Sequence, residues 1–141
     1  MGFSLIAAAA VLGFTLFMAV DIITSDLLPT IEDINDSYGD MKQRLGDQLQ
    51  TDINITSVQW STNSSNYDYN ISVLNIGSVT LHTKDFIILI NGTENHFTCS
   101  QEYLYPENTV FFRVVDVAGA GEKRLKVIAN NGIADYYAYT I

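Results

Sequence analysis

The chain has 141 residues, and its 16 acidic and seven basic residues give a formal net charge of −9. This balance makes nucleic acid a poor partner, because binding a polyanion requires clustered lysine and arginine. The single cysteine, Cys99, excludes a disulfide within the chain, so packing must stabilise the fold. We expect Cys99 to be a buried strand thiol, with pairing between chains as the alternative.

Residues 1–24 are predicted to form a transmembrane helix. The run from Gly2 to Val20 contains no charged residue, and about 20 apolar residues span a bilayer as a helix. A cleavable signal peptide would instead show a basic start, a shorter apolar stretch and a small-residue cleavage site. The first basic residue is Lys42, so a retained helix is favoured. The acidic, asparagine-rich flank favours an extracytoplasmic C-terminal side.

Residues 25–52 are predicted to form an amphipathic helical stalk, in which Pro29 should cause a kink or a short break. Eight acidic residues lie between Asp21 and Asp52, against Lys42 and Arg44. Apolar side chains recur at spacings of three and four and should share one stripe of the helix. The stripe could cover its own domain, a partner or a second copy, and its heptad-like spacing favours a homo-oligomer. The candidate association residues are Leu27, Ile31, Ile34, Tyr38, Met41 and Leu45.

Residues 53–141 are predicted to form an antiparallel, immunoglobulin-like β-sandwich, which makes the whole chain α+β. Short alternating or apolar runs separated by turn signals are typical of this architecture. Asn91-Gly92 is a strong hairpin signal, and 130–132 should form a second turn. The expected strands are Ile53–Trp60, Tyr67–Val73, Val79–His82, Phe86–Ile90, Thr109–Val115, Leu125–Ala129 and Ile133–Thr140.

Three features of this domain carry individual predictions. Trp60 should be a core residue or a contact between helix and domain. The loop 118–121 should precede an exposed strand face with the basic residues Lys123, Arg124 and Lys126. On the last strand, Tyr137 and Tyr139 should share the core face while Tyr136 points outward. If this strand lies at a sheet edge, it could pair with a second chain.

No pattern of residues indicates catalysis. The two histidines, His82 and His96, lack the companions of a metal site, and no nucleotide, hydrolase or zinc-protease motif is present. We therefore predict that the chain is not an enzyme and requires no cofactor.

Five Asn-x-Ser/Thr acceptor patterns favour an extracytoplasmic glycoprotein. The candidate glycosylation sites are Asn35, Asn54, Asn63, Asn70 and Asn91.

Three segments carry a resemblance over nearly the whole chain: MGFSLIAAAAVLGF at the start, Leu74–Gly92, and Lys123–Ile141. The chain resembles the archaeal type IV pilin-like superfamily, and in particular the F proteins of the archaellum, the archaeal flagellum. The resemblance implies a membrane-anchored stator protein whose β-domain binds S-layer protein. The other implied partners are the archaellum G protein and archaellins.

The alternative is a filament-forming archaellin or pilin-like subunit, whose N-terminal helix would pack in a filament core. Such a subunit normally begins with a short basic leader, so the initial methionine favours the uncleaved anchor. The expected location is the archaeal cell envelope, or an extracellular filament in the alternative.

Overall fold

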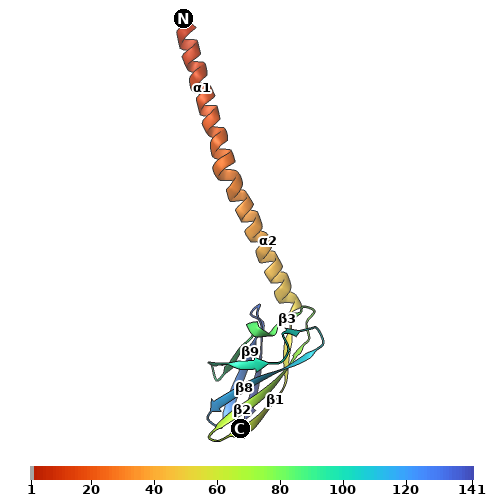
Figure 1. Ribbon diagram of the computed structural model, residues 1–141. Coiled ribbons are helices and arrows are strands. Elements are labelled where there is room, and N and C mark those ends of the chain that lie inside the picture. Colours follow the sequence, from red (N-terminus) through yellow and green to blue (C-terminus); the bar gives the residue numbers. More distant parts are fainter. Residues whose placement is uncertain (1) are drawn as a thin grey trace. The chain divides into compact units, whose positions relative to one another are not determined.

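The computed structural model describes residues 2–141, and these divide into two compact units between Gln43 and Arg44. The first unit is helical. The second contains the end of the helix and all of the strands (Figure 1).

The helical part consists of α1 (Gly2–Ile22), the π-helical turn η1 (Ile23–Leu27) and α2 (Leu28–Gln50). Five alanines and three leucines lie in α1, and these residues lose little side-chain entropy in a helix. The helix follows its apolar run past Asp21 without interruption.

Of the kink or short break expected at Pro29, the break does not occur, because the chain stays helical from Gly2 to Gln50. The irregularity lies one turn earlier, as the π-turn η1. Proline lacks the N–H that would bond four residues back and its ring crowds that carbonyl, so the backbone widens before it. The hydroxyls of Thr24, Ser25 and Thr30 donate to backbone carbonyls of the preceding turn, which supplies hydrogen bonds where the ladder is irregular.

The strands form two four-stranded antiparallel sheets and one short pair. Sheet one has the order β1-β2-β8-β6, sheet two has the order β10-β9-β4-β5, and β3 pairs with β7. The strands of sheet one are β1 (Ile53–Asn63), β2 (Asn66–Asn75), β6 (Phe97–Cys99) and β8 (Thr109–Ala118). Those of sheet two are β4 (Ile87–Ile90), β5 (Thr93–Asn95), β9 (Glu122–Ile128) and β10 (Ala134–Thr140). The short pair is β3 (Leu81–His82) and β7 (Tyr103–Leu104), with the 3-10 turn η2 (Thr83–Asp85) after β3.

One hydrophobic core lies between the two sheets and joins them into a sandwich. Ile71, Val73 and Phe112 of sheet one and Ile88 and Val127 of sheet two are completely buried. Alternation of inward and outward side chains along β8 and β9 produces this layer, as the period-two pattern predicts. The predicted α+β class with an antiparallel sandwich is confirmed.

The predicted turns are present where the sequence places them. Asn91 and Gly92 both have positive φ, as a two-residue hairpin turn between β4 and β5 requires. Gly132 has a φ of +87° in the turn between β9 and β10.

The last turn of α2 is tied to the loop that follows β2. The N–H groups of Ile76 and Gly77 donate to the Asp52 carbonyl, and Ser78 N–H donates to the Gln50 carbonyl. Buried Asn75 holds this loop, because its amide donates to Val79 O at 2.8 Å and to Leu104 O at 3.2 Å. The end of α2 is therefore part of the β-domain.

Several strand boundaries differ from those expected. The predicted strand Val79–His82 shortens to Leu81–His82, because Asn75 holds the chain before it in a turn. The sequence pattern missed β5, β6 and β7, which contain two or three residues each. Such runs are too short to show a period. Ile53 is buried at the start of β1, where the expected strand Ile53–Trp60 places it.

Candidate membrane-spanning and interaction surfaces

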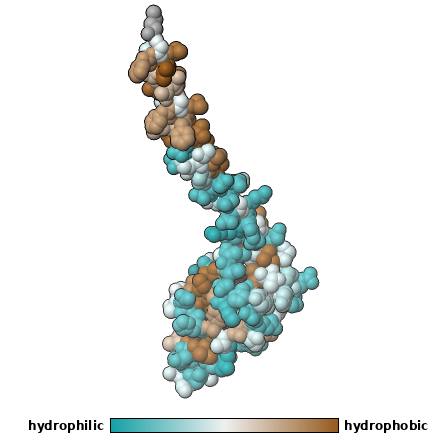
Figure 2. Space-filling view, turned by 45° about the horizontal axis from the view of Figure 1, so that its top comes forward, coloured by the Kyte–Doolittle hydropathy of each residue, from teal (hydrophilic) through white to brown (hydrophobic). Residues whose placement is uncertain are grey.

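The N-terminal helix is long and apolar enough to cross a membrane, by length and composition. Apolar residues follow one another along α1, so they lie on every side of it, and each large one in α1 is at least 49% exposed. Figure 2 shows the apolar side chains on one face. A helix that is apolar on every side is suited to lipid or to the interior of a helical assembly. Membrane insertion itself stays a prediction.

The α2 stripe lies beyond this apolar run. Its six predicted association residues are between 51% and 64% exposed. Asp36, Asp40 and Asp47 occupy other faces of the same helix, so the amphipathic pattern is strong. Association through the stripe stays a prediction.

An aromatic contact joins the edge strands of the two sheets. The rings of Trp60 on β1 and Tyr139 on β10 stack with centroids 5.7 Å apart, and Tyr69 meets Tyr139 edge-on at 5.6 Å. Trp60 is 42% exposed, so its assignment to the core is wrong. It lies at the margin of the sandwich, where β1 turns its end toward β10. Burial, with the neighbouring Tyr69 hydroxyl, raises the pKa of Tyr139 far above its usual range.

The tyrosine side chains of β10 point in the predicted directions. Tyr137 and Tyr139 pack on the core, whereas Tyr136 is 67% exposed and lies 5.1 Å from the Lys126 ammonium. The strand ends its own sheet, but β1 lies beside it, and Ile55 N–H donates to the Asp135 carboxylate at 2.7 Å. Pairing of this edge with a second chain stays a prediction.

The basic residues of β9 do not share one exposed face. Gly119 and Gly121 form the predicted loop, but Lys123 points inward, is 8% exposed and donates to the Ala118 carbonyl at 3.0 Å. Arg124 is exposed and Lys126 is half-buried. The expected run of three basic residues on an exposed face is therefore wrong at Lys123, because alternation along the strand turns that residue inward.

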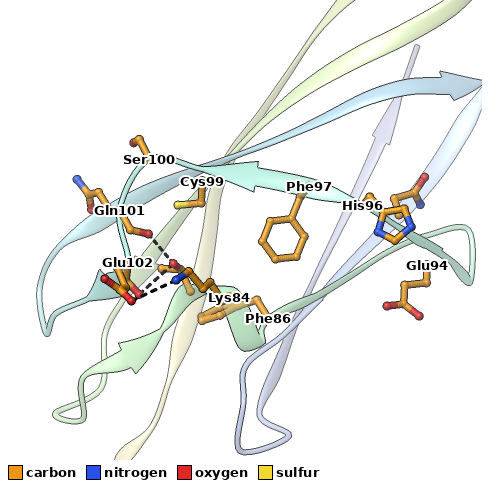
Figure 3. A pocket seen from close by; sticks show the side chains of 11 residues that line it. Lys84, Phe86, Glu94, His96, Phe97, Cys99, Ser100, Gln101 and Glu102 are labelled. Carbon is orange, nitrogen blue, oxygen red and sulfur yellow. Dashed lines mark hydrogen bonds and ion pairs between the residues drawn. The ribbon is translucent and has the colours of Figure 1, made fainter.

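A pocket of about 500 Å³ lies between residues 83–86 and the chain from Glu94 to Glu102 (Figure 3). Phe86 and Phe97 line it and both contact the core ring of Phe112. Cys99 lies at its wall in β6, as expected of a strand thiol, but it is half-buried and not buried as predicted. The Lys84 ammonium and the Glu102 carboxylate form an ion pair of 3.2 Å at the rim.

His82 lies between two carboxylates near this rim. Its Nδ1 is 3.0 Å from Asp85 and its Nε2 is 3.6 Å from Glu102. Lys84 and, secondarily, His82 lower the pKa of Glu102. Within residues 2–141, no three His, Cys, Asp or Glu side chains are grouped to hold a metal ion.

A polar network around Asp68 connects β1, β2 and β8 of sheet one. The Asp68 carboxylate accepts bonds from the Asp116 N–H at 3.1 Å, from the Asn63 amide at 3.3 Å and from Arg113 at 3.2 Å. These donors, the Asp116 N–H first, lower the pKa of Asp68. The network lets Asp116 adopt its positive φ of 63° at the irregular pairing of β2 and β8.

All five candidate glycosylation asparagines are exposed. Asn35 lies within α2, and Asn54 and Asn70 lie within strands. Asn63 ends β1, and Asn91 is at the tip of the hairpin between β4 and β5. Their modification stays a prediction.

Comparison with known proteins gives two matches of interest. The chain is 25% identical over 146 aligned residues to "Putative flagella-related protein F" of Methanocaldococcus jannaschii, covering 99% of this chain and 100% of that protein. The chain resembles an archaellum F protein. This agrees with the resemblance that the sequence indicates, whereas membership of the pilin-like superfamily stays a prediction.

The fold is similar to that of the archaellum periplasmic stator protein FlaG from Sulfolobus acidocaldarius. The TM-score is 0.52 at 16% identity, and the match covers 63% of this chain and 99% of that chain. No family model matches the sequence.

Proposed function

We propose that this chain is a structural, non-enzymatic stator component of the archaellum, anchored in the membrane by α1. One observation carries the proposal: a charge-free helical run precedes a β-sandwich of the same fold as a periplasmic stator protein. The full-length similarity to a flagella-related protein F supports the same assignment.

The β-domain would lie outside the cytoplasmic membrane and bind S-layer protein. A rotating filament needs an immobile counterpart, and a helix in lipid alone gives little resistance to lateral movement. A second attachment to the surface layer would supply that resistance. The polar surface and the exposed asparagines of Arg44–Ile141 suit an extracytoplasmic location. The G protein and archaellins are the further partners that the resemblance implies.

Chemical cross-linking in intact envelopes tests this proposal. A tagged full-length chain should be recovered with S-layer protein after cross-linking and solubilisation. The matched control is the same tag on α1 alone, which should be recovered from the membrane without S-layer protein. Recovery of neither chain with S-layer protein, from envelopes in which both are present, would contradict the S-layer assignment.

The filament-subunit alternative makes a different prediction for cell fractionation. A stator anchor stays with the membrane when filaments are sheared off, whereas a subunit with α1 packed in a filament core leaves with them. We expect the chain in the membrane fraction. Its presence in purified sheared filaments would favour the alternative and contradict the anchor.

A further inference from the structure

The apolar stripe of α2 repeats with a strict heptad. Leu27, Ile34 and Met41 are seven residues apart, and so are Ile31, Tyr38 and Leu45. The two series alternate at spacings of four and three, which are those of the d and a positions of a coiled coil. We propose that this stripe is a seam that pairs in parallel, and in register, with the same segment of a second copy of the chain.

The apolar side chains of the seam are exposed in the single chain, which favours a partner that covers them. Every seam residue has at least half of its side chain exposed. Removing apolar surface from water contributes about 25 cal/mol per Å². A second helix with the same stripe would bury both stripes at once, with each a and d side chain inserted between four side chains of the facing helix.

The placement of charges along α2 identifies the occupant as another copy. With Ile31 at position a, all five acidic residues of α2 fall at the outer positions b, c and f, away from the seam. They are Glu32, Asp33, Asp36, Asp40 and Asp47. A symmetric partner brings the same charges to the interface, so acidic residues beside the seam would repel each other. A helix that packs on a different surface must also keep charges out of positions a and d, but its acidic residues beside the seam could pair with basic residues of that surface.

The positions that flank the seam are compatible with parallel pairing. In a parallel coiled coil, each g residue faces the e residue of the next heptad in the partner. No pair formed in this way joins two charges of like sign. The facing pairs are Thr30 with Asn35, Ser37 with Lys42, and Arg44 with Leu49.

The two glycines of α2 also lie outside the seam. Gly39 and Gly46 are seven residues apart and both fall at the outer position b. An added Cβ at either position would meet nothing within 4 Å. These glycines weaken the helix by about 1 kcal/mol each without leaving a gap in the apolar stripe.

The parallel direction, and only that part of the inference, rests on the proposed membrane anchor. If α1 of each copy enters the same bilayer, both helices leave it in the same direction. A seam of fewer than three heptads is marginal for free helices in water, but confinement in one membrane raises the effective concentration. The pairing is therefore to be tested on the full chain in a membrane.

Cysteine cross-linking of the full chain in lipid vesicles provides the test. In a Cys99→Ser background, a single cysteine is placed near the middle of the seam (Ile34→Cys) or at its end (Leu45→Cys). The matched controls place it at outer positions of the same turns (Asp36→Cys and Asp47→Cys). All four sites are on the exposed helix surface. We expect mild oxidation to convert most of both seam variants to a disulfide-linked pair and to leave the controls monomeric.

Other outcomes overturn the proposal. Cross-linking of Ile34→Cys without Leu45→Cys indicates an antiparallel pair, because only residues near the centre then meet their own equivalents. Equal yields at seam and outer positions indicate random collision. No cross-link at either seam position indicates that the β-domain or another protein covers the stripe. None of these results changes the fractionation expected for the stator anchor, so the two proposals fail separately.

Discussion

At the scale of single residues, Asp68 shows how polar side chains stabilise a sandwich that has no disulfide. Its carboxylate satisfies a backbone N–H at the positive-φ residue Asp116 while also accepting bonds from Asn63 and Arg113. All of these donors favour the charged form, which is why the pKa of Asp68 lies below its ordinary value of 3.8. The fold therefore gains stability from an ionised group that acid removes.

The Asp68→Asn variant should make folding less sensitive to acid. The pKa of Asp68 is depressed in the folded state, so its contribution is complete above the unfolded value and disappears as the pH falls through the folded value. The variant should melt at a lower temperature than the parent at about pH 7, and the difference should shrink as the pH falls below the ordinary aspartate pKa of 3.8. Circular dichroism of the full chain in detergent measures this difference.

Glu94→Gln is the control for that experiment, because Glu94 is an exposed carboxylate of β5 with no ion pair among residues 2–141. It should follow the parent at every pH. A difference between Asp68→Asn and the parent that stays constant across the range would show that the carboxylate contributes by shape alone.

Asn35 brings two of the sequence predictions into conflict. It is a candidate glycosylation site, yet it falls at the e position beside the proposed seam of α2. A glycan there would occupy the space of the partner's g residue. Asn91 lies on the β4–β5 hairpin, away from the proposed seam. Its side-chain oxygen accepts a bond from the Arg124 N–H at 2.8 Å, and its amide nitrogen donates no bond within residues 2–141.

We predict that glycans occupy Asn91 and not Asn35. Mass spectrometry of peptides from the native chain, before and after enzymatic or chemical deglycosylation, would measure occupancy at both sites. The Asn91→Gln variant should lose one glycan, and Asn35→Gln should leave the mass of the sugar component unchanged. A glycan on Asn35 in cross-linked chains would contradict the parallel seam.

At the scale of elements, the joint after α2 depends on a close backbone approach at Gly77. A Cβ added there would lie 2.5 Å from both Asp52 N and Gln50 O, which are backbone atoms and cannot turn away as a side chain could. Gly46 lies in α2, and a Cβ added there would meet no atom within 4 Å. The two glycines therefore differ in what they do for the fold.

Replacing each glycine by alanine should have opposite effects. Gly77→Ala should destabilise the domain by about 1–3 kcal/mol, because the backbone must shift to relieve the overlap. Gly46→Ala should stabilise α2 by up to about 1 kcal/mol. Denaturant unfolding followed by the fluorescence of Trp60, the one tryptophan, measures both. Equal effects of the two substitutions would mean that the joint relaxes without cost.

How much of these elements could be predicted depends on how far each pattern extends. The helices and the long strands β2 and β8 show their periods over ten or more residues, so the sequence predicts them. The strands β6 and β7 exist through pairing with distant partners, which no local pattern reveals. The burial of Trp60 and Lys123 differs from the prediction because it also depends on the folded sheet. Hydrophobicity does not indicate that this tryptophan lies at the margin of the sandwich or that this lysine points inward.

The surfaces were predictable to a similar degree. The heptad of α2 and the asparagine patterns can be read from residue spacing alone. The pocket could not be predicted, because residues 83–86 face the chain from Glu94 to Glu102 only in the folded sandwich.

At the scale of the whole molecule, the boundary of the second unit differs from the change of periodicity near residue 53. The compact unit begins at Arg44 and includes the last turn of α2. Gln48 donates to the Asn131 carbonyl at 2.7 Å, and buried Thr51 accepts a bond from the Asn131 amide. The helix end therefore satisfies polar groups of the turn between β9 and β10 as well as those of the loop after β2.

We predict that a fragment of residues 44–141 folds as a soluble, cooperative unit. A fragment of residues 53–141 should be less stable by several kcal/mol, because each hydrogen bond that it loses contributes about 1 kcal/mol. The shorter fragment removes the carbonyls of Gln50 and Asp52 that accept from the 76–78 loop. It also leaves Asn131 without three of its partners, which are Asp47, Gln48 and Thr51. Denaturant unfolding of the two fragments measures the difference. A matched fragment of residues 44–141 carrying Gln48→Ala should lie between them, because it loses one bond and keeps the backbone acceptors. Equal stability of all three would place the boundary at the first strand and would show that the helix end contributes nothing to the domain on which it lies.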